Sequence, residues 1–167
     1  MNKIEEFMKL NALSEQEVLE LLFEYSNKSI IEVDYRKPLE NALILNGLMI
    51  RNVEIGNDSF PNNPLLKGKK KILTKLFVPE TAETETEAIT RMKNEGYRPA
   101  TFIELVSIHR GLSDYQRQFS IFALGSPFLS RLNNHVYPFI NKEGANLSRC
   151  SYPEKKIHRL LAVLIEK

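Results

Sequence analysis

The sequence predicts an α+β fold, with a helical N-terminal region over residues 1–40 and a mixed core over residues 41–167. Two observations support this prediction. Apolar residues recur at helical spacing through the first 29 residues, whereas short apolar runs and short helical patterns mix after residue 30. Helices followed by mixed short elements are typical of α+β proteins rather than of a regular parallel βαβ sheet.

Length and composition together indicate the number of domains and the class of the protein. The chain has 167 residues, of which 43% are apolar and 26% charged, as expected for one soluble domain with a small appendage. Its net charge of +2 is too balanced to indicate nucleic-acid binding by itself. The single cysteine, Cys150, excludes an internal disulfide and a cysteine-based zinc cage, and favours a reducing compartment.

The N-terminus does not resemble a targeting segment. It carries acidic residues where a signal peptide needs an apolar run, and no apolar stretch in the chain is long enough to span a bilayer. We therefore expect a cytoplasmic protein without a membrane partner.

The first elements are predicted from caps and spacing. Ser14 and Glu17 have the S-x-x-E pattern of a capping box, and helix-spaced apolar residues follow them. Residues 30–33 form a short candidate strand. Pro38 suits the first position of a helix, because its missing N–H is not needed there, and Gly47 would end that helix.

The middle of the chain alternates between strand and loop signals. Residues 48–55 alternate imperfectly between apolar and polar, which predicts a strand. Residues 57–71 contain two prolines and four lysines and predict a surface loop. A strand is expected over residues 72–78, and Pro79 would end it.

Two helices are predicted next. Residues 81–95 are acidic at the start and basic at the end, which suits the helix dipole, and Gly96 is a natural residue to end this helix in a left-handed conformation. Thr101 and Glu104 form a second capping box, T-x-x-E, for a helix running to about His109.

Three strands are predicted in the last third of the chain. Residues 120–124 are short and apolar, and we expect them to form a buried central strand. Residues 136–140 are a further strand that Pro138 would interrupt. Residues 157–165 have an apolar run whose period fits helix or strand, and frequent Val and Ile favour a strand.

Three segments of the chain resemble a group of small uncharacterised bacterial proteins. They are GYRPAT at residues 96–101, ALGS at residues 123–126 and RLLAV at residues 159–163. In that group the segments are similar to "GYRPATLEELL", "ALGS" and "LAV". The likeness covers residues 42–167.

The group is similar in turn to the C-type-lectin-like fold of formylglycine-generating enzymes and of the variable proteins of diversity-generating retroelements. The resemblance implies a small twisted, mainly antiparallel sheet with flanking helices. It also implies a ligand-binding segment just before the final strand. The corresponding candidate residues here are Asn146, Ser148, Arg149, Tyr152, Lys155, Lys156 and His158.

This chain departs from the resemblance in two ways. It has no tryptophan, which the group usually carries in the segment before the final strand, so one aromatic anchor of recognition is missing. It also has one cysteine, whereas the formylglycine-generating enzymes need a pair. Their oxidase activity is therefore not expected here.

Three functions follow as hypotheses. The leading one is a non-enzymatic module that binds a protein or small ligand without a cofactor or metal, since no histidine has metal-ligand spacing. The alternative is a nucleic-acid- or nucleoprotein-associated accessory or inhibitor protein that contacts phosphates through a basic loop. The third is a small enzyme that uses Cys150 as a nucleophile. The basic loop consists of Lys67, Lys69, Lys70 and Lys71.

Overall fold

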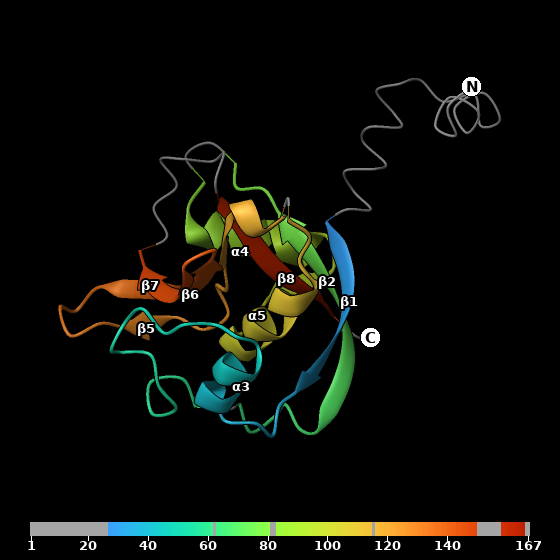
Figure 1. Ribbon diagram of the computed structural model, residues 1–167. Helices are drawn as coiled ribbons and strands as arrows, with labels where there is room; N and C mark the ends of the chain where they lie inside the picture. Colours follow the sequence, from blue (N-terminus) through green and yellow to red (C-terminus); the bar gives the residue numbers. More distant parts are fainter. Residues whose placement is uncertain (1–26, 62, 81–82, 115, 150–157, 166–167) are drawn as a thin grey trace, which may run out of the picture.

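The computed structural model describes residues 27–61, 63–80, 83–114, 116–149 and 158–165 (Figure 1). They form one eight-stranded sheet in the order β1-β2-β8-β4-β6-β5, with β3 beside β8 and β7 beside β6. Among the strand pairs, only β4 and β8 are parallel. The α+β class is therefore confirmed. The strands are β1 (Lys28–Asp34), β2 (Lys69–Phe77), β3 (Tyr97–Pro99), β4 (Ser120–Phe122), β5 (Phe128–Leu129), β6 (His135–Asn141), β7 (Gly144–Ser148) and β8 (His158–Leu164).

Strand β8 lies inside the sheet and is buried on both faces. It pairs with β2 along one edge, and with β4 and then β3 along the other. Leu161 and Val163 pack into one hydrophobic cluster, whereas Leu160 and Ala162 pack into a second. Apolar residues at every position are expected for such a strand, which explains why its sequence lacks a period of two. The strands predicted at residues 120–124 and 157–165 are confirmed with shorter bounds, Ser120–Phe122 and His158–Leu164, and they lie side by side.

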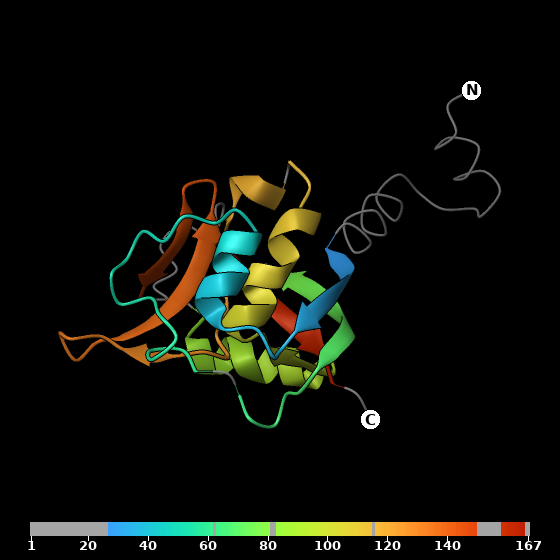
Figure 2. The same cartoon turned by 60° about the horizontal axis from the view of Figure 1, so that its bottom comes forward.

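Within the described residues, α-helices cover both faces of the sheet (Figures 1 and 2). Helices α3 (Leu39–Leu45) and α5 (Phe102–Ile108) lie next to each other on one face and contribute to the first cluster. Helix α4 (Glu85–Asn94) covers the other face, where its Ala88 and Met92 are fully buried in the second cluster. The sheet is therefore the middle layer of three.

Helix α4 shows how local sequence sets the ends of a helix. Thr84 is its N-cap, and the Thr84 backbone N–H donates to the Glu87 carboxylate at 2.7 Å while the Glu87 N–H donates to the Thr84 hydroxyl at 3.3 Å. Gly96 follows the helix with φ of +83°, the left-handed conformation predicted for it. The helix begins at Glu85 rather than at residue 81, because this cap lies at Thr84.

Several predictions in the first half of the core were wrong. Residues 48–55 do not form a strand: they make one parallel bridge, from Ile50 to Ala145, and then turn. The Asn52 side chain accepts a hydrogen bond from the Glu54 N–H at 2.8 Å, and this Asx turn replaces further pairing. The predicted loop at residues 57–71 is too long by three residues, because β2 already begins at Lys69.

Further corrections concern strand ends and short strands. Lys28 and Ser29 belong to β1 rather than to a helix, and Pro138 does not interrupt β6. Proline keeps a backbone carbonyl, and the Pro138 carbonyl accepts from the Ala123 N–H at 3.0 Å. Strands β3, β5 and β7 were not predicted.

Strand β1 precedes the predicted boundary at residue 40 and pairs with β2 along its whole length. The capping box at Ser14 and Glu17 lies outside the described residues. Within the described ranges, no helix combines the length and apolar character that a bilayer crossing requires.

Candidate binding pocket

The segment that links β3 to α5 is organised by one buried carboxylate. Glu104 is completely buried, and its Oε2 accepts a hydrogen bond from the Thr101 N–H at 2.7 Å, as the T-x-x-E pattern predicts. The same carboxylate accepts two hydrogen bonds from Arg98, at 2.6 and 3.0 Å, and one from the Tyr35 hydroxyl at 2.5 Å. Glu104 therefore ties together β3, the start of α5 and the chain directly after β1.

The electrostatics of this cluster favour one fixed charge state. Burial opposes ionisation of Glu104, but the hydrogen bonds and charge of Arg98 outweigh it and hold the pKa of Glu104 below its usual value. The hydrogen bond to Glu104 raises the pKa of the Arg98 guanidinium. Burial and, second, the hydrogen bond to Glu104 raise the pKa of the Tyr35 hydroxyl. The cluster is thus an ion pair plus a neutral phenol at neutral pH.

The segments GYRPAT and ALGS contact each other directly. The Gly125 N–H donates to the Ala100 carbonyl at 2.9 Å, and the Ser126 hydroxyl accepts from the Phe102 N–H at 2.9 Å. A side chain at Gly125 would not fit, because a Cβ there would lie 2.7 Å from the Ala100 carbonyl oxygen. This close approach holds the loop after β4 against the first residue of α5.

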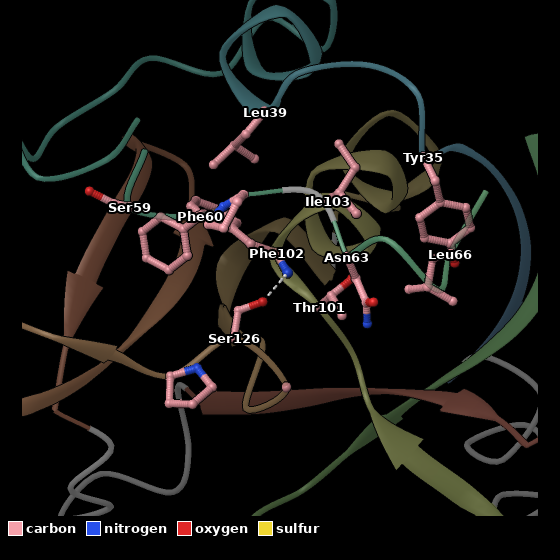
Figure 3. Close-up of a pocket in the computed structure, with 13 residues that line it drawn as sticks. Tyr35, Leu39, Ser59, Phe60, Asn63, Leu66, Thr101, Phe102, Ile103 and Ser126 are labelled. Atoms are coloured by element: carbon pink, nitrogen blue, oxygen red, sulfur yellow. Dashed lines mark hydrogen bonds between the residues drawn. The ribbon is translucent and has the colours of Figure 1, made fainter. Parts of the chain in front are cut away.

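A pocket of about 240 Å³ opens above this contact (Figure 3). One wall is the loop that follows α3, the other is the loop that follows β4, and the start of α5 lies between them. The Phe60 ring contacts the Phe102 ring edge to face, with centroids 5.0 Å apart. The described lining residues are Tyr35, Leu39, Ser59, Phe60, Pro61, Asn63, Leu66, Thr101, Phe102, Ile103, Gly125, Ser126 and Pro127.

The chemistry of the described lining is neutral. It contains no carboxylate and no basic side chain, and Tyr35, whose hydroxyl already donates to Glu104, is its only titratable group. Leu39, Phe60 and Phe102 are buried and apolar, whereas Ser59 and Asn63 supply polar groups near the surface. Such a lining suits a ligand whose apolar end enters the pocket and whose polar part stays at the mouth, rather than an ion.

The predicted display residues do not line this pocket. Asn146 and Ser148 are half-buried on β7, where they pair with β6, and Arg149 is exposed just after it. His158 begins β8 and its ring meets the Phe122 ring edge to face at 5.1 Å. Strands β6 and β4 lie between β7 and β8, so these residues do not form one cluster. Tyr152, Lys155 and Lys156 lie outside the described residues, as does Cys150.

The four lysines of the predicted basic loop are all exposed, but three of them belong to β2 rather than to a loop. Lys69 forms an ion pair with Glu32 at 3.5 Å, and Lys71 is the cross-strand neighbour of Glu32. Arg159, from the second basic group in the sequence, is buried with its guanidinium 3.7 Å from the centre of the Phe119 ring. Arg159 therefore does not extend the exposed surface of the four lysines.

The pocket was not predicted from the sequence. Its walls come from residues near 35, 60, 101 and 126, and no local pattern connects them. The only available signal was the resemblance of GYRPAT and ALGS to one protein group, since these segments supply part of the lining. Within the described residues, no group of three or more His, Cys, Asp or Glu side chains could hold a metal ion.

Comparisons with known proteins add nothing to this geometry. No protein-family model, no curated protein and no solved structure matches the chain.

Proposed function

We propose that this protein is a non-enzymatic protein-binding module whose pocket at the start of α5 accepts one apolar side chain of a partner. The neutral, partly aromatic lining of that pocket is the observation that carries the proposal. Residues that dominate protein interfaces are commonly apolar or aromatic anchors that fill such pockets.

The size of the pocket favours a side chain over a whole cofactor. Sites for small molecules usually enclose about 300–1,000 Å³, whereas this pocket holds about 240 Å³. A nucleotide or a sugar phosphate would also need charged partners, and the described lining offers none. A leucine or phenylalanine side chain needs no charged partner.

The rim of the pocket supports contact with a larger partner. Leu65 is 86% exposed and adjoins the lining residue Leu66, and Leu129 is 53% exposed two residues after the lining residue Pro127. Exposed leucines beside an apolar pocket would extend the area that a partner covers. We therefore favour a protein partner over a free small ligand.

Hydrogen bonds also hold the loop after β4 and the start of α5 in place. Gly125 and Ser126 are hydrogen-bonded to the start of α5, and Glu104 ties α5 to β3 and Tyr35. A preformed pocket lowers the entropy lost on association, which is a requirement for useful affinity from a small interface.

The test is a selection of peptides from a random library on the full chain, followed by calorimetry of each selected peptide on three proteins. Ser59→Trp places a large side chain in the pocket mouth, whereas Asp58→Trp places it on the exposed neighbour that does not line the pocket. We expect the selected peptides to share an apolar anchor. We expect Ser59→Trp to lower the affinity for these peptides at least tenfold, and Asp58→Trp to lower it less than twofold. Equal affinities for both variants, or peptides that share only charged residues, would contradict the proposal.

The resemblance to the C-type-lectin-like fold also stays a proposal. It is supported by a mainly antiparallel sheet with helices on both sides, and by the position of β8 after a polar segment. The display role of residues 146–158 stays a prediction in the same sense. The nucleic-acid alternative has less support, because Lys69 is paired with Glu32 and Arg159 is buried.

A further inference from the structure

Strands β2 and β8 pair over only part of their lengths. Residues Thr74–Phe77 pair with Leu160–Val163, whereas the first part of β2, Lys69–Leu73, pairs with β1 alone. A groove of about 580 Å³ lies along this open edge of β2, beside the end of β8. Its described lining is Ile30, Tyr35, Leu66, Lys70, Lys71, Ile72, Leu73, Arg98, Val163, Leu164 and Ile165.

The groove exposes apolar side chains that a folded protein usually covers. Ile30 is 74% exposed, Ile165 46% and Leu164 39%, and all three lie in one continuous lining. Contiguous exposed apolar surface marks a site where another segment or molecule binds.

The same lining is basic. It contains Lys70, Lys71 and Arg98 and, among the described residues, no carboxylate. Arg98 is already bound to Glu104, whereas Lys70 and Lys71 are exposed and form no ion pair within the described ranges. An occupant of the groove should therefore combine apolar side chains with at least two negative charges.

The N-terminal 26 residues of this chain have that composition. They contain six glutamates and two lysines, for a net charge of −4, and they include the helix-spaced residues Val18, Leu21, Leu22 and Tyr25. They enter the fold at Asn27, which is buried and whose carbonyl accepts from the Leu76 N–H at 2.8 Å. This fixed entry point is three residues before Ile30, which lines the groove.

We propose that residues 14–25 of the same chain occupy this groove as a helix antiparallel to β1. From Tyr25 back to Glu17 a helix rises about 12 Å, and from Lys28 to Glu32 a strand advances about 13 Å. Glu17 would then lie level with Lys71, the cross-strand neighbour of Glu32. Leu21 and Leu22 would cover Ile30 and the end of β8.

Zero-length carbodiimide cross-linking of the full chain tests the contact, because it joins a lysine to a carboxylate only when they touch. We expect cross-links from Lys70 or Lys71 to Glu17 or Glu20, and none from those glutamates to the exposed Lys142, which lies outside the groove. An equimolar mixture of ¹⁴N and ¹⁵N protein should give cross-linked peptides of one isotope only. Mixed-isotope peptides would show an exchange between two copies and would overturn the proposal, as would the absence of these cross-links.

Hydrogen exchange of the full chain gives a second readout that does not depend on the cross-linker. Lys70→Glu with Lys71→Glu should accelerate exchange over residues 14–25 at least tenfold, and Lys142→Glu should leave it unchanged. Adding Glu17→Lys and Glu20→Lys to the double variant makes both sides of the proposed contact opposite in charge again. The exchange rate over residues 14–25 should then return to within twofold of that of the natural chain. An equal effect of Lys142→Glu, or no restoration by the reversed pair, would contradict the proposed contact.

Discussion

The buried carboxylate of Glu104 is the strongest single test of how the pocket is built. Glu104→Gln keeps the shape of the side chain but removes its charge. The two Arg98 hydrogen bonds and the Tyr35 hydrogen bond then meet a neutral amide, and one of the two acceptor oxygens becomes an NH₂ group. We expect a large loss of stability from a substitution that creates no cavity.

The exposure of the two partners bounds the size of this loss. Removing one member of a fully buried ion pair costs about 3–5 kcal/mol, whereas an exposed pair contributes about 0–1 kcal/mol. Glu104 has no exposed side-chain surface and Arg98 has 32%. We therefore expect Glu104→Gln to lower the free energy of unfolding by about 2–4 kcal/mol, between these limits and nearer the buried one.

The pH dependence of this difference has a definite sign. The pKa of Glu104 is held below its usual value in the folded protein, so its contribution is fully present above the pKa of the unfolded chain, near 4.3. The contribution is lost as the pH falls through the lower, folded pKa. The difference between the natural chain and Glu104→Gln should therefore be constant from pH 7 to about 5 and shrink below about pH 4.

Urea unfolding followed by circular dichroism, repeated between pH 7 and pH 3, measures both quantities. Glu143→Gln is the matched control, because Glu143 is exposed and its side chain makes no ion pair among the described residues. We expect this control to stay within about 0.5 kcal/mol of the natural chain. A loss below about 1 kcal/mol for Glu104→Gln, or a difference that grows on acidification, would refute the reasoning.

Two further substitutions test the contact between GYRPAT and ALGS. Gly125→Ala should cost about 2–3 kcal/mol in urea unfolding, because its Cβ would lie 2.7 Å from a backbone oxygen, whereas Gly111→Ala, with no atom within 4 Å, should not destabilise. A Gly125→Ala variant as stable as Gly111→Ala would contradict the close approach. Ser126→Ala removes the acceptor of the Phe102 N–H. It should lower the free energy of unfolding by about 1 kcal/mol, and the melting temperature with it. An unchanged melting temperature would show that water replaces the hydroxyl.

The start of α5 shows what sequence could and could not predict. The T-x-x-E pattern correctly placed Glu104 on the Thr101 N–H, because that interaction joins residues three apart. The bond from Tyr35 to Glu104 joins residues 69 apart, and nothing in the local pattern of either residue indicates the other. The cap was therefore predictable and the buried cluster around it was not.

Strand predictions failed where side chains did not follow a simple period. Residues 48–55 alternate well enough to suggest a strand, yet Val53 is 90% exposed, because the Asn52 side chain starts a turn there. The lysines at the start of β2 suggested a loop, but Lys69–Lys71 pair with the backbone of β1, and Lys69 forms an ion pair with Glu32 there. A local side-chain turn decided the first case, and a pairing strand distant in sequence decided the second.

The central claim is that the pocket at the start of α5 binds an apolar side chain. An NMR titration with a small apolar probe tests this claim most directly. N-acetyl-phenylalaninamide has about 15 non-hydrogen atoms. At about 0.3 kcal/mol for each atom, a fitting pocket would bind it with a Kd of about 0.5 mM. Methyl resonances of Leu39, Leu66 and Ile103 should shift when the full chain is titrated with this probe. The methyl resonances of Leu164 and Ile165, which lie outside the pocket, should not shift. In the Ser59→Trp variant the shifts of the pocket resonances should be absent. Unmoved pocket resonances at several millimolar probe, or equal shifts in the Ser59→Trp variant, would contradict the account.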